Sequence, residues 1–183
     1  MDYEASKFLI RHALCTIGYM LDSASGLARL ATCFRHARPE ERWRFQGIVV
    51  KYAVEMAMER HSNYFVQLVL DHGDIQFRCG LVYKLMMQFA SLSLHPHGNY
   101  LVQHCVRNRR TGSPQHDLLP IVLSACNRQS IRELQGLVQT PPATFVLHTL
   151  LQTGEAVTHS RELTQNLERK INDLLWRARR YRR

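Results

Sequence analysis

The most constraining feature of this sequence is a seven-residue segment that occurs twice, 36 residues apart. Residues 61–67 read His-Ser-Asn-Tyr-Phe-Val-Gln, and residues 97–103 read His-Gly-Asn-Tyr-Leu-Val-Gln. The apolar positions upstream of the two copies also fall into the same register. A fixed period in the thirties is typical of solenoids, in which each unit buries its apolar face against its neighbours. The period therefore predicts a stack of similar units without one central core.

Two weaker copies extend this period in both directions. One lies around residues 26–31, 36 residues before the first clear copy. The other lies at residues 143–148, 45 residues after the second, and a polar insertion at 109–115 accounts for most of the excess. We call these four segments the crests; they lie near residues 26–31, 62–67, 98–103 and 143–148.

The hydrophobic pattern is helical almost throughout, and alternating strand-like runs are absent. Gly, Pro and Ser clusters divide it into short helices. We expect a single all-α domain over residues 1–183 that ends in a basic helix over 157–183. The expected helices span residues 3–20, 25–37, 40–51, 53–59, 63–72, 74–88, 90–94, 98–108, 116–126, 129–138, 142–152 and 157–180.

Helical geometry gives each crest a polar and aromatic face. With Asn63 at 0°, Gln67 lies at about 40° and Tyr64 at about 100°, while the apolar residues lie on the opposite side. Such helices, stacked side by side, present amides and aromatic rings at regular intervals. Flat ligands at regular spacing, above all unstacked nucleobases, suit this surface. The equivalent positions of the next two crests are Asn99, Tyr100 and Gln103, and Thr144, Phe145 and His148.

The charge balance also favours an anionic partner. The chain has 24 Lys and Arg against 15 Asp and Glu, a formal net charge of +9. A large part of the surplus lies in the last residues, where a cation cluster predicts contacts to a nucleic-acid backbone or a nuclear address. Cations that suit the negative end of a helix dipole are the other interpretation. The arginines concerned are Arg177, Arg179, Arg180, Arg182 and Arg183.

Several functional classes are not supported by the sequence. No apolar run is long enough to span a membrane, and the acidic start does not resemble a secretory signal. Five scattered cysteines without a Cys-x-x-Cys pair predict a reduced, intracellular protein. His95, His97, His104 and Cys105 are close in sequence but not on one helical face, so we expect no metal site. No catalytic motif occurs, so we expect neither an enzyme, a cofactor nor a small-molecule substrate.

The segment from His97 to His104, preceded by Leu94-His95-Pro96, resembles the Pumilio (PUF) repeat, and so does the segment from Ser62 to Gln67. The resemblance implies a right-handed α-solenoid (an armadillo-like α-α superhelix) of three-helix repeats, of which this chain holds about four to five. It also implies that the concave face binds single-stranded RNA, usually in mRNA 3′ untranslated regions. Regulation of mRNA translation or stability in the cytoplasm, with protein corepressors on the convex face, would follow.

The resemblance assigns roles to individual residues. Asn63 and Gln67 would read the edge of one uridine, and Asn99 and Gln103 the edge of the next. Tyr64, Tyr100 and Phe145 would stack on bases, and Thr144 and His148 take the edge positions of the last crest in a combination without a known reading. Because the family runs antiparallel to its RNA, the uridine at Asn99 would lie 5′ of the uridine at Asn63. The first crest offers only Leu27, Ala28 and Ala31, which read no base.

Two alternatives to selective RNA binding remain open at this stage. The first is a degenerate helical-repeat scaffold that binds proteins, which the degraded first and fourth crests favour. The second is RNA binding through arginines alone, without preference for sequence. With two clear reading repeats we expect about micromolar affinity for RNA. The alternative location to the cytoplasm is the nucleus or nucleolus.

Overall fold

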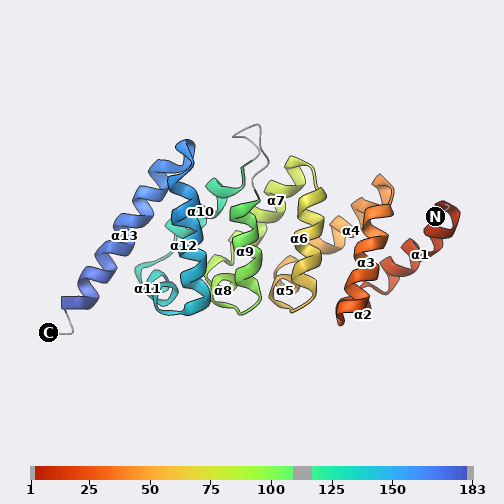
Figure 1. Cartoon of the computed structure of the whole chain (residues 1–183), viewed down its shortest axis with the longest axis horizontal. Coiled ribbons are helices and arrows are strands. Elements are labelled where there is room, and N and C mark those ends of the chain that lie inside the picture. The colour runs from red at the N-terminus through yellow and green to blue at the C-terminus, as the bar shows by residue number, and fades with distance from the viewer. Residues whose placement is uncertain (1–2, 109–116, 181–183) are drawn as a thin grey trace.

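Helices stack side by side into an elongated row of three-helix units (Figure 1). The computed structural model describes residues 3–108 and 117–180, and all regular elements in these two stretches are helical. The first unit comprises α1 (Tyr3–Cys15), α2 (Ile17–Leu21) and α3 (Ala24–His36), and the second comprises α4 (Pro39–Lys51), α5 (Ala53–Met58) and α6 (Ser62–His72). The third unit comprises α7 (Ile75–Met86), α8 (Phe89–Leu94) and α9 (Gly98–Arg107), and the fourth comprises α10 (Leu119–Asn127), α11 (Ile131–Gln139) and α12 (Pro141–Glu155). The chain continues with the 3-10 helix η2 (Thr158–Ser160) and with α13 (Arg161–Arg180).

The third helices of the units form a continuous inner row of α3, α6, α9 and α12, with α4, α7 and α10 behind them (Figure 1). Each helix of the inner row contacts the next, and α13 packs on α12 and then slants away from it (Figure 1). All four crests lie in the N-terminal halves of the inner-row helices. The predicted all-α solenoid is therefore confirmed, and its repeats stack as the sequence period indicates.

The first predicted helix, over residues 3–20, is wrong in one respect, because it divides at Thr16 into α1 and α2. Thr16 has φ −112° and ψ 16°, outside the helical region, and its hydroxyl donates to the backbone oxygen of His12 at 2.8 Å. A hydroxyl that bonds the preceding turn competes with helix propagation. The insertion at 109–115 and the first residue of the expected helix 116–126 lie outside the described residues. None of the described helices combines the length and apolarity needed to cross a membrane.

Three phenylalanines join the first unit to the second. Phe34 on α3, Phe45 on α4 and Phe65 on α6 are fully buried. Their ring centroids lie 5.7, 5.9 and 6.0 Å apart, and each pair meets edge to face. Such aromatic pairs stabilise a core beyond the area that they bury. The core of this solenoid therefore lies between neighbouring units, as a nearest-neighbour stack requires.

A second recurring contact fixes the start of each inner-row helix. A Cβ atom on Gly26 would lie 2.1 Å from the backbone oxygen of Met20, and one on Gly98 would lie 2.7 Å from the backbone oxygen of Leu92. Both distances are too short for a carbon atom. Glycine is therefore needed where α3 and α9 begin, because the backbone there touches the end of the preceding short helix.

In the second unit, serine stands at the position that glycine occupies in the first and third units. Ser62 stands 36 residues from both Gly26 and Gly98, is buried, and donates its hydroxyl to the backbone oxygen of Met56 at 2.7 Å. The accepting residues, at positions 20, 56 and 92, also follow one another at intervals of 36. The sequence period is thus the period of one physical contact.

We expect Gly98→Ala to lower the free energy of unfolding by about 1–3 kcal/mol, because the added methyl group overpacks the contact with Leu92. Gly80 lies in α7 with nothing within 4 Å of its would-be Cβ atom, so Gly80→Ala should instead raise the unfolding free energy by up to about 1 kcal/mol. Urea unfolding followed by circular dichroism measures both. Equal changes in the two variants would contradict this account of the repeat.

Candidate nucleic-acid interface

Three aromatic side chains stand on neighbouring helices of the inner row. Tyr64 on α6 is 52% exposed, Tyr100 on α9 is 54% exposed and Phe145 on α12 is 64% exposed. Each lies in the first turns of its helix, one per unit. Aromatic rings are normally buried in a core when nothing else is required of them. The row therefore offers one accessible flat apolar group in each of the second, third and fourth units.

The asparagine that precedes each tyrosine is buried and bonded to the backbone. Asn63 is 1% exposed, and its Nδ2 donates to the backbone oxygens of Glu59 at 2.7 Å and Arg60 at 3.0 Å. Asn99 is 5% exposed, and its Nδ2 donates to those of His95 at 2.9 Å and Pro96 at 2.8 Å. Both amide protons of each side chain are thus used by the turn that leads into the helix.

This arrangement differs from the expectation that asparagine and glutamine both face an open surface. The backbone carbonyls three and four residues before Asn63 and Asn99 belong to the connecting turn and need donors. A short amide in the first turn of a helix folds back onto such carbonyls readily. That Asn63 and Asn99 read base edges stays a prediction, and in the described conformation their amide protons are engaged.

Each glutamine is held by the asparagine one turn earlier. Gln67 Nε2 donates to Asn63 Oδ1 at 3.1 Å, and Gln103 Nε2 donates to Asn99 Oδ1 at 3.0 Å. This contact uses one of the two amide protons and leaves a second proton and the amide oxygen. Gln67 is half-buried, whereas Gln103 is 8% exposed. The structure thus presents one donor and one acceptor from each glutamine at a fixed position beside a tyrosine.

Two residues that the sequence analysis did not select lie beside Gln103. The hydroxyl of Thr149 on α12 is 3.5 Å from Gln103 Oε1, and Arg107 donates to the Thr149 oxygen at 3.3 Å. Arg107 lies one helical turn after Gln103 and is exposed. The spacing of four residues along one helix face was the available signal. Arg107 therefore adds a cation to the reading surface of α9.

The first and fourth units depart from this pattern. Thr144 is exposed, and its hydroxyl donates to the backbone oxygen of Pro141 at 2.7 Å, so it serves the start of α12. His148 is exposed on the same helix. On α3 the equivalent positions carry Leu27, Ala28 and Ala31, which have no hydrogen-bonding side-chain atoms. The amide pair is thus confined to α6 and α9.

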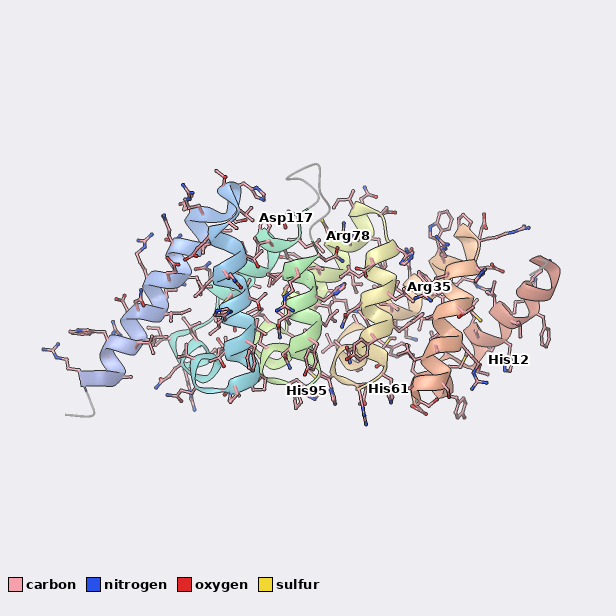
Figure 2. The ribbon with its side chains drawn as sticks, in the orientation of Figure 1. His12, Arg35, His61, Arg78, His95 and Asp117 are labelled. Atoms are coloured by element: carbon pink, nitrogen blue, oxygen red, sulfur yellow. The ribbon has the colours of Figure 1, made fainter. Side chains whose placement is uncertain are left out.

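A polar network fixes the other end of α6 and α9. His104 Nε2 lies 2.8 Å from Asp71 Oδ1, and Asn108 also bonds that carboxylate. Arg78 on α7 is 1% exposed and donates to the backbone oxygen and side-chain oxygen of Asn108, both at 3.3 Å. Figure 2 shows Arg78 at the opposite end of these helices from His61 and His95. The network ties the second unit to the third and keeps the two glutamines in register.

The histidines near the crests serve the turns. The ring of His95 accepts from the backbone nitrogens of His97 at 3.2 Å and Gly98 at 3.3 Å, which caps the start of α9. Over residues 3–108 and 117–180, no three His, Cys, Asp or Glu side chains gather as a metal site would require. Burial raises the pKa of the Cys105 and Cys126 thiols to about 12, so both are poor nucleophiles.

The predicted backbone-binding arginines are described only in part. Arg177 and Arg180 are exposed on α13, and the Arg180 guanidinium lies 4.8 Å from the centre of the Trp176 ring. The side chain of Arg179 and residues Arg182 and Arg183 lie outside the described part of the chain. Figure 1 shows α13 slanting away from the inner row, so its last turn is remote from α9. Their contact with a nucleic-acid backbone stays a prediction.

Fold and site together define a class: an α-solenoid that presents one aromatic ring from each of the second, third and fourth units, with a fixed amide beside the ring on α6 and α9. Residues 52–86 and 88–110 match the family model described as the Pumilio-family RNA binding repeat. These residues extend from α5 to α9 and include both Asn, Tyr and Gln sets. Residues 52–110 therefore match Pumilio-family repeats, which confirms the resemblance identified from the sequence.

Relatives of known description agree with this assignment. The chain is 23% identical over 162 residues to the putative pumilio homolog 8, chloroplastic, of Arabidopsis thaliana, covering 86% of this chain and 27% of that protein. It thus spans about a quarter of this curated relative.

Solved structures show the same fold at low sequence identity. The Puf3 RNA binding domain bound to a Cox17 RNA 3′ UTR recognition sequence superposes with a TM-score of 0.71 at 12% identity, over 90% of this chain and 45% of that one. The PUM-HD domain of S. pombe Puf1 in complex with RNA gives 0.68 at 16%, over 91% and 41%. PUF-8 in complex with PBE-RNA gives 0.64 at 18%, over 88% and 52%. The chain spans about half of each.

We expect Asn99→Ala to lower the free energy of unfolding by about 1–3 kcal/mol, because it removes the side-chain donor to the backbone oxygen of Pro96 and one of the two donors to that of His95. Gln67→Ala, which removes one contact from a half-buried side chain, should cost less than about 1 kcal/mol. Chemical unfolding of the two variants tests this difference. A larger loss for Gln67→Ala would show that the asparagine bonds do not support the fold.

Proposed function

We propose that the chain binds single-stranded RNA through the second and third units and prefers uridines at two consecutive positions. One observation carries this proposal. Helices α6 and α9 lie side by side on the inner row, and each presents an exposed tyrosine together with a glutamine amide held in place: Tyr64 and Gln67 on α6, Tyr100 and Gln103 on α9. The Pumilio-repeat match to these same units supports it.

The chemistry of the glutamine amide suits a uracil edge. Uracil offers an N3–H donor flanked by carbonyl acceptors, and a primary amide offers an acceptor beside a donor. The base N3–H would donate to the glutamine Oε1. A base carbonyl would accept from the second Nε2 proton of the glutamine, the one that is not donated to the asparagine. Guanine presents the same donor and acceptor at its N1 and O6, but its additional N2 donor finds no acceptor in this pair. Asn63 and Asn99 act by positioning the glutamines, and contact a base only when a turn carbonyl releases them.

The two positions are unequal. The amide of Gln67 is the more accessible, whereas a base at α9 has to displace the weak contact between Thr149 and Gln103. The exposed Arg107 beside Gln103 compensates by attracting the RNA phosphate. The nucleotide at α6 therefore contributes more base preference, and the nucleotide at α9 more salt-dependent affinity.

In the cell, such binding would act on mRNA 3′ untranslated regions, controlling translation or stability, in the cytoplasm rather than in the nucleus or nucleolus. The action is recognition without catalysis. Protein corepressors would bind the outer helices, where Trp43 on α4 is 67% exposed and Tyr83 on α7 is 58% exposed. Exposed aromatic residues are enriched in protein interfaces.

The test of base reading is fluorescence anisotropy with short RNAs that carry UU, UG, GU or GG at the centre. We expect UU to bind about tenfold more tightly than GG, and Gln67→Ala/Gln103→Ala to remove this difference while leaving salt-sensitive binding. Equal binding of all four RNAs by the wild-type protein would leave only attraction by arginines. Absence of binding would favour the protein scaffold.

A second prediction concerns stacking. Replacing both Tyr64 and Tyr100 by alanine should weaken UU binding at least about tenfold, since each stacked base contributes about 1–3 kcal/mol. The fold should survive because both rings are more than half exposed. Tyr83→Ala is the matched control, as this tyrosine is equally exposed but lies on the outer helix α7. An equal loss of affinity for Tyr83→Ala would show that RNA binding does not depend specifically on the inner-row face that carries Tyr64 and Tyr100.

A further inference from the structure

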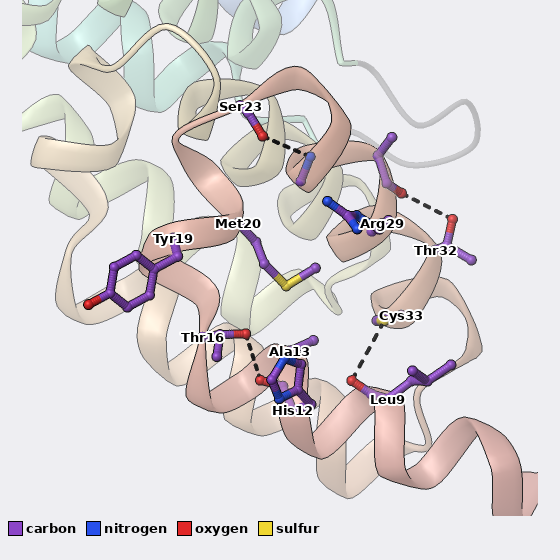
Figure 3. Close-up of a pocket in the computed structure, with 12 residues that line it drawn as sticks. Leu9, His12, Ala13, Thr16, Tyr19, Met20, Ser23, Arg29, Thr32 and Cys33 are labelled. Atoms are coloured by element: carbon purple, nitrogen blue, oxygen red, sulfur yellow. Dashed lines mark hydrogen bonds between the residues drawn. The ribbon is translucent and has the colours of Figure 1, made fainter.

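An open cavity of about 730 Å³ lies within the first unit, between α1, α2 and α3 (Figure 3). Its walls are largely apolar and include Leu9, Ala13 and Met20. Two basic residues, His12 and Arg29, line it, and none of the lining residues is acidic. A cavity of this size takes a nucleoside or a similar small group.

Arg29 occupies a position that other units use for packing. At intervals of 36 residues, Arg29 is followed by Phe65 and Leu101, which are both fully buried. Arg29 is exposed instead, and Figure 3 shows its side chain at the cavity. The first unit therefore carries a cation where the stack elsewhere carries a hydrophobic anchor. Phe65 packs on Phe34 of the preceding unit, whereas no described unit lies before α1, so the side chain of Arg29 is open to a ligand.

The hydroxyl groups of the cavity serve the local backbone. Thr16 donates to the oxygen of His12 at 2.8 Å, Thr32 donates to that of Ala28 at 3.0 Å, and Ser23 accepts from the Gly26 nitrogen at 3.1 Å. These contacts leave the cation, the apolar walls and one aromatic ring to meet a ligand. The ring belongs to Tyr19, which lines the cavity and is 84% exposed.

The cavity continues the row of stacking rings. Ala28 lines it and stands 36 residues before Tyr64, at the position where the second unit places its ring. Since the first unit has no ring there, the space beside α3 stays open. In the antiparallel orientation implied by the family resemblance, RNA that leaves α6 toward α3 runs in the 3′ direction.

We propose that this cavity binds the nucleotides immediately 3′ of the two uridines. A base rests against the apolar wall and stacks on Tyr19, and the adjoining phosphate lies at Arg29 and His12. The site holds any base, because no free amide or carboxylate among its lining residues reads an edge. This inference rests on the proposed function and adds to it a second, sequence-independent contact.

The test compares the affinity of a UU RNA that ends at the second uridine with that of three extended RNAs. One carries two further 3′ nucleotides, one carries two abasic 3′ nucleotides, and one carries two further 5′ nucleotides. We expect the first extension to tighten binding by about fivefold or more, and the abasic extension to keep only a small part of this gain through its phosphates. Any gain from the 5′ extension belongs to Phe145 on α12 and should not depend on Arg29 or Tyr19. Arg29→Ala and Tyr19→Ala should each remove most of the 3′ gain. Both side chains are exposed, so the variants keep the fold.

Matched controls are Arg44→Ala and Tyr83→Ala, which remove an exposed arginine and an exposed tyrosine from the outer helices α4 and α7 and should keep the gain. A 4-thiouridine at the extended 3′ position should crosslink within residues 9–33, and crosslinks confined to other segments would overturn the proposal. So would a 3′ gain that survives both Arg29→Ala and Tyr19→Ala, or one that abasic nucleotides preserve in full. In these cases an intact preference for UU over GG would leave the proposed function standing, whereas loss of that preference would remove both.

Discussion

The first turn of each inner-row helix is the contact on which the rest of this structure depends. There, in the first three units, the helix lies against a carbonyl of the preceding short helix: Gly26 and Gly98 leave no room for a Cβ atom, and Ser62 donates its hydroxyl to the carbonyl. One residue later in the second and third units, an asparagine binds two carbonyls of the connecting turn. The exposed tyrosine follows directly. The turn that seats the helix on its unit therefore also directs the ring outward.

The fold and the proposed binding surface depend on the same side chains. In Asn63 and Asn99 the same amide secures the turn and holds the glutamine that faces the ligand. Substitution of either asparagine disturbs both the turn and the position of the glutamine. Its effect on ligand affinity therefore cannot be separated from its effect on stability by substitution alone. The glutamines and tyrosines carry no such double task. They are the positions at which this surface can change its ligand without losing its shape.

Much of the architecture was predictable because a repeat imposes the same contact several times. The period placed all four crests in the inner row, and Leu27, Ala28 and Ala31 of the first crest carry no side-chain group that could read a base edge. The burial of Asn63 and Asn99 was not predictable, because a helical projection ignores the turn that precedes the helix and its unsatisfied carbonyls. The contact of Thr149 with Gln103 joins residues 46 positions apart and depends on how closely α12 packs on α9. Such distances between units are not encoded in a local pattern.

The side-by-side packing of the inner row sets a length scale for anything that lies along it. Helices in contact are about 8–10 Å apart, whereas stacked bases in a nucleic-acid strand follow one another at about 3.4 Å. If a strand offers one base to each helix, the distance between its neighbouring bases must therefore increase by more than the thickness of one aromatic ring. Tyr64 and Tyr100 project into the row at this interval and fill the space that the neighbouring bases vacate. The spacing of the helices thus selects a single, unstacked strand before any hydrogen bond is formed, and a base-paired duplex does not meet its pitch.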